Sequence, residues 1–366
     1  MFKIAFIKYG GLAAGGTEIH LQTLAANLPS NTFDIDYFYC DATKYIGSNW
    51  KHPDTDIYRK QYLENSNVNL IKFHVEAKDI TKPYHPWLGT DFWQKFNETD
   101  YDLIISARAG HPEYPFTQIL NTPIIFFVTL IAGVDNQKNI YKNVLISNWA
   151  AKQWIKQGGQ KKLLKVLPLL KEINFKDQTI SKKRFFTYGF HQRDNDEIFS
   201  PVPLKAYKKI MSNDTAFTIM GGSNKYSFQA KELKLINFNQ LPHTGSEKKI
   251  HTFLKNLDVF AHGRSDGETF GQIFVEAMYH GLPIISHKAQ NNAQVEVVGK
   301  AGKVFSKFNT IGYSSEMFKL KSNKKYYKKV SKISLARYKD VYSLEINIEK
   351  FIKLIHEAII RKESND

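Results

Sequence analysis

The strongest constraint on the fold is an alternation of short apolar runs with amphipathic stretches in the first half of the chain. Runs rich in β-branched and aromatic residues are typical of strands buried in a parallel sheet. The stretch 17–28 keeps apolar residues close to a 3.6-residue period, which predicts a helix. The predicted strands are FKIAFIKY, FDIDYFYC, VNLIKF, DLIISA, PIIFFVTLI and KNVLIS. This half is therefore predicted to consist of βαβ units.

The pattern restarts after KVLPLLKEINF (165–175), with predicted strands RFFTYGF, TAFTIMGG, KLINF, LDVFAHG and LPIISH. A chain of 366 residues is also too long for one ordinary hydrophobic core. We therefore predict an α/β protein with two Rossmann-like, doubly wound domains that face a cleft, residues 1–170 and 171–342. A helical segment, 343–366, is expected to pack back toward the first domain. Such domains bind ligands at the carboxyl ends of their strands.

Cysteine content and apolar runs bear on the location of the protein. Cys40 is the one cysteine of the sequence, so the fold does not depend on an internal disulfide. The longest apolar run, 123–134, falls short of the roughly 20 residues that cross a bilayer. The N-terminal MFKIAFIKYGG is typical of a first strand and not of a signal peptide. We expect a cytoplasmic protein without a transmembrane helix.

The first predicted strand ends in a glycine-rich loop, KYGGLAAGGTEIH (8–20). Gly15 and Gly16 lie directly before a helix that Thr17 is expected to cap, and such a loop can present backbone N–H groups to a phosphate. The spacing is not the GxGxxG of a dinucleotide site, which argues against a nicotinamide cofactor. A tight turn that needs glycine for backbone reasons alone is an equal alternative.

The most informative stretch is GRSDGETFGQIFVEAMYHGLPIIS (263–286). Its residues predict a strand (DVFAHG), a turn (RSDGETFG), a helix that ends at Gly281, and a further strand. Residues 269–272 then lie at the start of the helix. Their free N–H groups, with no side chain on Gly271 to obstruct approach, are suited to a diphosphate.

Glu268 and Glu276 flank this predicted anion site. Eight residues span roughly 12 Å if helical, whereas the two carboxyl groups of a glycosidase lie within about 5–9.5 Å. The spacing therefore favours two contacts to one long ligand, such as a nucleotide sugar with its sugar near Glu268 and its ribose near Glu276. The alternative is a surface glutamate in a turn and a solvated glutamate on a helix.

These residues resemble the donor-site signature of retaining glycosyltransferases of family 4, which have the GT-B fold. The resemblance covers the glutamate pair, AMYHGLPIIS after it, and AAGGTEIH near the N-terminus. It implies transfer of a sugar from a nucleotide sugar to an acceptor with retention of configuration. It also implies that Glu268 contacts the donor sugar, that Glu276 contacts the ribose, and that the donor phosphates meet Gly15, Gly16, Thr269, Phe270 and Gly271.

The resemblance also implies partners and further site residues. The donor is expected to be UDP- or GDP-linked, no cofactor or divalent metal is expected, and the acceptor is a glycan or a lipid-linked hydroxyl compound. Where the family has an Arg and a Lys on the phosphates, this chain offers Arg193 and, less well, Lys225. Where the family has a catalytic-centre His, it offers His111, with Arg108 and Thr129 as other candidates. Solvated or turn roles remain open for Arg193 and His111.

The formal net charge of +16 is concentrated near the C-terminus. Residues 301–366 hold fifteen Lys or Arg against seven Asp or Glu, and FKLKSNKKYYKKVSKIS (318–334) mixes lysines with tyrosines. This mixture is expected at an anionic membrane, here the inner face, or on a solvated helix. No recognised nucleic-acid motif accompanies it, so a nucleic-acid partner is not expected.

Three classes of function follow from the sequence. The leading one is a retaining, metal-independent glycosyltransferase. The second is another GT-B enzyme, such as a nucleotide-sugar epimerase, which needs no acceptor. The third is a binding protein for an anionic polymer, whose affinity would fall steeply with salt.

Overall fold

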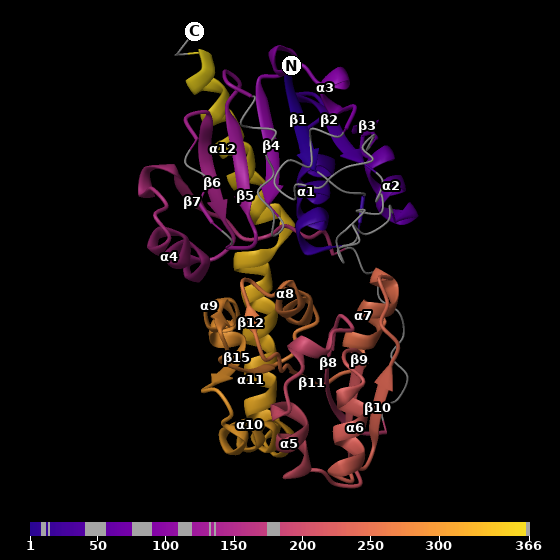
Figure 1. Cartoon of the computed structure of the whole chain (residues 1–366). Helices are drawn as coiled ribbons and strands as arrows, with labels where there is room; N and C mark the ends of the chain where they lie inside the picture. Colours follow the sequence, from indigo (N-terminus) through magenta and orange to yellow (C-terminus); the bar gives the residue numbers. More distant parts are fainter. Residues whose placement is uncertain are drawn as a thin grey trace. The chain divides into compact units, whose positions relative to one another are not determined.

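The structure is a computed structural model that describes residues 1–8, 12–13, 15–40, 56–74, 90–108, 119–131, 133–134, 137–173 and 184–363. The chain divides into two compact units. Unit 1 comprises Met1–Glu172 and Leu344–Asp366, and unit 2 comprises Ile173–Ser343. Figure 1 shows the elements of both units along the chain. The predicted junction after residue 170 lies close to the division between Glu172 and Ile173.

Unit 1 is built on a parallel sheet in the order β3-β2-β1-β4-β5-β6-β7. This is the doubly wound order, in which the chain starts in the middle and reverses direction between β1 and β4. The strands are β1 (Phe2–Lys8), β2 (Phe33–Cys40), β3 (Asn69–Phe73), β4 (Leu103–Arg108), β5 (Ile124–Val128), β6 (Ile140–Leu145) and β7 (Leu164–Val166). The helices are α1 (Gly16–Asn27), α2 (Ile57–Glu64), α3 (Phe92–Lys95), α4 (Asn148–Lys156) and α12 (Leu344–Glu363), with short 3-10 turns η1 (Glu98–Asp100) and η3 (Lys161–Leu163).

The core of unit 1 includes the C-terminal helix. α12 buries Phe351, Leu354 and Ile355 in the same apolar cluster as Phe6 of β1 and Leu24 of α1. These α12 positions recur at the helical spacing that places them on one face. The last helix of the sequence is therefore an integral layer of unit 1 (Figure 1).

Unit 2 repeats the arrangement with a parallel sheet in the order β10-β9-β8-β11-β13-β15. Its strands are β8 (Phe186–Gln192), β9 (Thr215–Gly221), β10 (Phe238–Leu241), β11 (Val259–Ala261), β13 (Ile284–His287) and β15 (Gly302–Phe305), with a separate pair, β12 (Gly267–Glu268) and β14 (Asn291–Asn292). Its helices are α5 (Val202–Lys208), α6 (Lys225–Glu232), α7 (Glu247–Lys255), α8 (Gln272–Tyr279), α9 (Ala293–Val298), α10 (Thr310–Ser322) and α11 (Lys324–Arg337), with turns η4 (Asp196–Ile198), η5 (Gly299–Ala301) and η6 (Tyr338–Tyr342). The predicted α/β fold of two doubly wound domains is confirmed.

Two local predictions are wrong. KLINF (234–238) is not a strand, because Lys234 and Asn237 adopt φ of 49° and 52°, which no extended strand accommodates. The strand β10 begins only at Phe238. The N-cap of α1 is Gly15, without a side-chain cap, and Thr17 lies inside the helix. Among the helices that the structure describes, none is long and apolar enough to cross a membrane.

Candidate functional site

The candidate site of unit 2 lies where the strand order reverses. β8 and β11 are neighbours in the sheet although β9 and β10 lie between them in the chain. In a doubly wound sheet the segments that leave two such strands separate, and ligands bind there. The segments here are His191 to Arg193 after β8 and His262 to Glu268 after β11.

The loop after β11 leads into the start of α8. Its N-cap, Gly271, has a left-handed backbone, with φ of 92° and ψ of 70°, and no side chain caps the helix. A Cβ at Gly271 would lie 2.5 Å from the ring of Phe274 and 3.3 Å from Cγ of Glu268. The first N–H groups of a helix have no intrahelical acceptor, so the start of α8 offers backbone donors that suit an anion. Phe270 is buried and packs edge-on against Tyr342.

Glu268 lies beside this helix start and is held by Arg264. Arg264 Nη1 donates to Glu268 Oε1 at 3.2 Å, while Nε and Nη2 donate to the two oxygens of Asp266 at 2.5 and 2.8 Å. The Glu268 side chain is only 12% exposed. Burial raises the pKa of the Glu268 carboxyl, and the guanidinium of Arg264 acts in the opposite direction. Glu268 is therefore not the exposed turn residue that the alternative interpretation required.

His262 lies on the other side of Glu268. Its Nε2 lies 3.7 Å from Glu268 Oε1, and its Nδ1 lies 3.0 Å from Ser286 Oγ. Burial, with added repulsion from His287, Arg264 and His191, holds the pKa of His262 well below the usual value of 6.5. The ring is therefore neutral at physiological pH, and it offers a hydrogen-bonding edge to Glu268 without adding charge.

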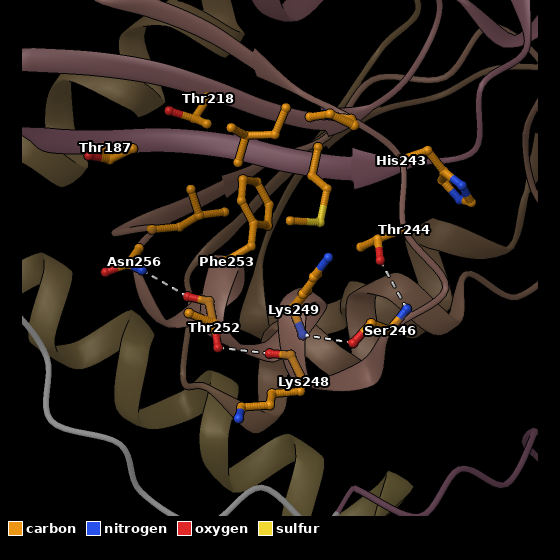
Figure 2. Close-up of a pocket in the computed structure, with 14 residues that line it drawn as sticks. Thr187, Thr218, His243, Thr244, Ser246, Lys248, Lys249, Thr252, Phe253 and Asn256 are labelled. Carbon is orange, nitrogen blue, oxygen red and sulfur yellow. Dashed lines mark hydrogen bonds between the residues drawn. The ribbon is translucent and has the colours of Figure 1, made fainter. Parts of the chain in front are cut away.

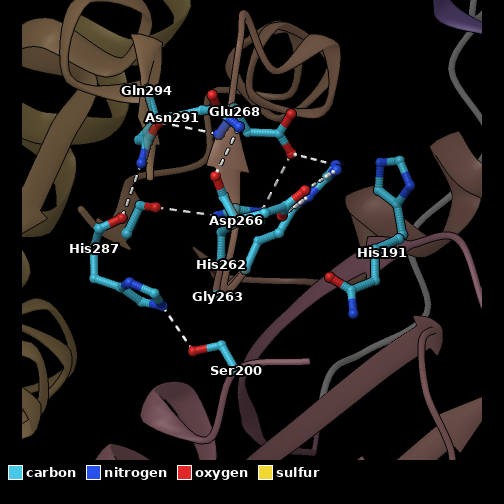
Figure 3. A network of polar contacts seen from close by, with 12 residues as sticks. His191, Ser200, His262, Gly263, Asp266, Glu268, His287, Asn291 and Gln294 are labelled. Atoms are coloured by element: carbon cyan, nitrogen blue, oxygen red, sulfur yellow. Dashed lines mark hydrogen bonds and ion pairs between the residues drawn. The ribbon is translucent and has the colours of Figure 1, made fainter. Parts of the chain in front are cut away.

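A second layer of hydrogen bonds fixes the loop that carries Glu268 (Figure 3). Gln294 Oε1 accepts from the backbone N–H of Glu268 at 3.2 Å, and Gln294 Nε2 donates to the carbonyl of His287 at 3.1 Å. Asn291 donates to the carbonyl of Asp266 from its backbone and its side chain, at 2.8 and 2.9 Å. The β12–β14 pair thus ties the loop to α9.

Tyr226 joins three strand ends below the site. Its hydroxyl accepts from Gln192 Nε2 and from the backbone N–H of Ser200, and it donates to the carbonyl of Gly263, all at 3.2 Å. Ser200 Oγ lies 2.8 Å from His287 Nε2. The ends of β8, β11 and β13 are therefore connected by side-chain hydrogen bonds.

Glu276 is the second predicted carboxylate, and it is buried rather than solvated. It lies on α8 and is 4% exposed, with Oε2 2.8 Å from Nε2 of His191 at the end of β8. The rings of His191 and His262 both pack against Phe260 of β11, with centroid distances of 6.1 and 6.2 Å, and His262 lies 3.7 Å from Glu268. The structure thus brings both predicted glutamates to one group of residues around the ends of β8 and β11.

Two cations, Arg193 after β8 and Lys225 after β9, make no ion pair with either glutamate among the contacts of the described residues. Arg193 is exposed, and its charge lowers the pKa of Glu268. Lys225 is half exposed and lies 4.0 Å from Asp196. Asp194 and Asp196 form an Asp-x-Asp pair two residues after the end of β8, so our expectation from the sequence that no such motif lies at a strand end is wrong. Among the described residues no group of three acidic, His or Cys side chains has the arrangement of a metal site.

The predicted first-domain residues belong to unit 1. Gly15 caps α1 and Gly16 is its first residue, where an added Cβ would meet no atom within 4 Å. Thr17 Oγ1 donates to Oγ1 of Thr129 at 2.9 Å, so these two hydroxyls fix the helix start to the end of β5. His111 and the side chain of Arg108 lie outside the described residues.

A pocket of about 790 Å³ lies between α7 and the face of β8, β9 and β10 (Figure 2). Its size is within the range of small-molecule sites. Apolar side chains form its floor, and hydroxyls and lysines gather at the α7 end. Its lining includes Met220, Leu241, Phe253 and Leu257 among the apolar residues and His243, Thr244, Lys248 and Lys249 among the polar ones.

Sequence reasoning missed several residues that organise the site. Arg264, Asp266 and Gln294 carry the polar contacts of Glu268, and His191 faces Glu276. The contact of Arg264 with Glu268 had no periodic signal, since it lies in a loop that the two-residue β12–β14 pair holds in shape. The contact of His191 with Glu276 had no local signal, since it depends on the order of strands in the sheet.

Comparisons with known proteins agree with this architecture. Residues 201–336, all within unit 2, match the family model of glycosyl transferases group 1. A comparison of the sequence with curated proteins returned no match. Among solved structures, HepE of Anabaena in complex with UDP and glucose is similar at 15% identity, with a TM-score of 0.73, over 98% of this chain and 100% of that one.

Two further solved structures are similar over nearly the whole chain. A glycosyltransferase from Rickettsia africae has 12% identity and a TM-score of 0.73, covering 98% of both chains. Sucrose-phosphate synthase from Thermosynechococcus elongatus has 13% identity and a TM-score of 0.72, covering 99% of this chain and 100% of that one. At such identities the likeness establishes the fold, and the predicted GT-B class is confirmed. The chain thus has the GT-B fold, and part of its second unit is similar to glycosyl transferases group 1.

Proposed function

We propose that this protein is a retaining glycosyltransferase of the family 4 type that transfers a hexose from a UDP- or GDP-linked donor to a glycan or lipid-linked acceptor. The observation that carries the proposal is the position of Glu268. This carboxylate is buried, oriented by Arg264, and adjacent to the glycine-capped start of α8. Within a glycosyltransferase group 1 domain, such a group is suited to the sugar hydroxyls of a nucleotide sugar.

The donor diphosphate is assigned to the N-terminus of α8. The backbone N–H groups after Thr269, at Phe270 and Gly271, would donate to the phosphate oxygens, and the helix dipole favours their negative charge. Arg193, exposed and close enough to act on Glu268, adds a mobile cation. Preorganised donors of this kind stabilise the diphosphate as it leaves, so no divalent metal or other cofactor is required. Gly15 and Gly16, at the start of α1 in unit 1, remain proposed donor-binding residues.

The nucleoside end of the donor is assigned to Glu276 and to the pocket under α7. Glu276 is held by His191 at the end of β8, which suits a carboxylate that accepts from ribose hydroxyls. The carboxyl ends of β9 and β10, the next strands in the sheet, contribute Met220 and Leu241 to the pocket. An aromatic base bound there would cover apolar surface, with Thr244 and His243 as polar partners.

The location of the reaction is also part of the proposal. Cys40 is buried in unit 1, and a fold without disulfides is compatible with the cytoplasm. A lipid-linked acceptor would place the enzyme at the inner face of a membrane as a peripheral protein. His111, which the resemblance assigns to the reacting centre, remains a proposed catalytic residue.

Two alternatives make different predictions. A nucleotide-sugar epimerase would convert the donor without an acceptor, and a binding protein for an anionic polymer would ignore nucleoside diphosphates.

The test is a product assay with the full-length chain. The protein is incubated with UDP- and GDP-linked sugars, with and without p-nitrophenyl glycosides and extracted lipid-linked glycans, and products are followed by NMR. We expect acceptor-dependent release of nucleoside diphosphate and a glycoside with the anomeric configuration of the donor. An inverted product would refute retention, and an epimerised donor without acceptor would establish the alternative enzyme class.

A further inference from the structure

A charged helical hairpin in unit 2 takes no part in the proposed donor site. Residues 303–332, which include α10 and most of α11, hold nine lysines and one acidic residue, Glu316. Glu316 is 4% exposed and contacts Lys303 Nζ at 2.7 Å and the hydroxyl of Tyr326 at 2.6 Å. Lys321 is paired with Asp214 at 2.7 Å. The exposed surface of the hairpin therefore keeps a strong positive charge.

The same hairpin exposes large apolar side chains. Ile311 and Phe318 on α10 are 70% and 58% exposed. They are seven residues apart, which places them on one face of the helix. The opposite face already supplies the core of unit 2 with Tyr313 and Met317, both fully buried. Ile311 and Phe318 therefore do not contribute to the hydrophobic core of unit 2.

Phe308, directly before the N-cap of α10, is unfavourable for folding in two ways. Its φ of 64° is a left-handed value that bulky residues rarely adopt, and its side chain is 65% exposed. A residue at this place often packs against the fourth residue of the helix, here Tyr313. Tyr313 is instead buried, with its hydroxyl on the carbonyl of His262. A strained and exposed phenylalanine indicates a role outside the fold.

Lysines adjoin Phe308 and Phe318 in the sequence. Lys307 Nζ lies 5.1 Å from the ring centre of Phe308. Lys319, next to Phe318, lies 4.0 Å from the ring centre of Tyr326 in the first turn of α11. α10 and α11 pack against each other, and α11 continues with exposed lysines at 324, 325, 328 and 329. Apolar and cationic groups thus meet on one hairpin (labelled in Figure 1).

We propose that this hairpin docks on an anionic lipid bilayer. Phe308, Ile311 and Phe318 enter the boundary between headgroups and acyl chains, and the lysines of α11 contact lipid phosphates. The composition favours a bilayer over a nucleic acid, because the segment 303–332 contains no arginine and exposes an aliphatic Ile311 that cannot stack on bases. The proposal adds a membrane contact to the proposed function and does not depend on the donor site.

The test is vesicle cosedimentation of the full-length chain. Vesicles of phosphatidylcholine alone are compared with vesicles that also contain phosphatidylglycerol, at low and high salt. The apolar variant combines Phe308→Asn, Ile311→Ser and Phe318→Ser, and Asn also accepts the left-handed backbone at 308. The charge variant combines Lys324→Gln, Lys325→Gln, Lys328→Gln and Lys329→Gln. A matched control changes Phe228, Lys231 and Lys234, which are exposed elsewhere on unit 2.

We expect wild type and control to bind anionic vesicles and to release at high salt. Each test variant should bind about tenfold or more weakly, because each removes one of two required contributions. Wild-type binding by the apolar variant, or binding to DNA in place of vesicles, would overturn the proposal. Nucleotide binding, measured in the same variants, should be unchanged, so a failure of the membrane proposal is distinguishable from a failure of the proposed function.

Discussion

At the scale of single residues, Glu268 is the group on which the proposed chemistry depends most. Its hydrogen bonds to the donor sugar should strengthen as positive charge develops at the anomeric carbon. Glu268→Gln keeps the shape and removes the charge, so we expect kcat to fall by roughly ten- to hundredfold, equivalent to about 1.5–3 kcal/mol, with a smaller change in donor affinity. The measurement is steady-state kinetics with the affinity of the donor determined by calorimetry. A variant with unchanged kcat would remove Glu268 from the reacting centre.

His20 gives a prediction about stability in unit 1. Its Nδ1 accepts from the backbone N–H of Leu170 at 2.8 Å, and burial lowers its pKa from 6.5 to about 3. The unfolded chain therefore binds a proton that the folded chain does not as the pH falls below 6.5. Titration of His20 should therefore lower the free energy of unfolding by about 1.4 kcal/mol for each pH unit between pH 6.5 and about pH 3.

His20→Asn provides the comparison for this titration. Urea denaturation, followed by circular dichroism at pH 7 and pH 5, should show a shallower pH dependence in the variant, whatever its absolute stability. An identical slope in both proteins would mean that folded His20 binds a proton as readily as unfolded His20, so that burial does not lower its pKa.

At the scale of elements, the start of α8 is the feature most open to a single test. Gly271→Ala places a methyl group against the ring of Phe274 in a left-handed backbone that costs alanine about 1–2 kcal/mol. We expect a lower thermal midpoint and at least a tenfold loss of nucleoside diphosphate affinity. Gly281→Ala is the control, because Gly281 also has a left-handed backbone, lies after the C-terminal end of α8, and its Cβ would meet no atom closer than 3.4 Å. Equal nucleotide affinity in both variants would mean that the start of α8 does not bind the phosphates.

Elements with strong local patterns could be predicted from the sequence. β1, β2 and α8 follow from apolar periodicity, and the start of α8 follows from a glycine directly before a helical pattern. β10 could not be placed, because the left-handed residues Lys234 and Asn237 delay it by several positions, and nothing in their side chains demands that backbone.

The contacts around the two glutamates were predictable only in part. That Glu268 and Glu276 flank a helix start follows from their spacing. That Arg264 binds Glu268 depends on the β12–β14 pair, which holds the loop in shape, and two-residue strands leave no periodic signal. That His191 meets Glu276 depends on how β8 is ordered in the sheet, which is a non-local property.

At the scale of the whole molecule, the GT-B fold and the match of residues 201–336 to glycosyl transferases group 1 lead to a prediction about divalent metals. The phosphate charge is assigned to the start of α8 and to Arg193, so transfer should retain most of its rate in EDTA. Initial rates with and without chelator are the measurement. Complete loss of activity, restored by Mg²⁺ or Mn²⁺, would instead assign the Asp194 and Asp196 pair to a metal-bound donor.

The central claim is that unit 2 binds the nucleotide part of a sugar donor through the residues around α8. Calorimetric titration of UDP and GDP, in EDTA, into the full-length wild type and Glu276→Gln tests it most directly. Circular dichroism checks that both proteins are folded. We predict binding of one nucleotide by the wild type and an affinity weaker by about 1–3 kcal/mol in the variant, since Glu276 is assigned to the ribose hydroxyls. Absence of binding to either nucleotide, or equal affinity in the two proteins, would contradict the account.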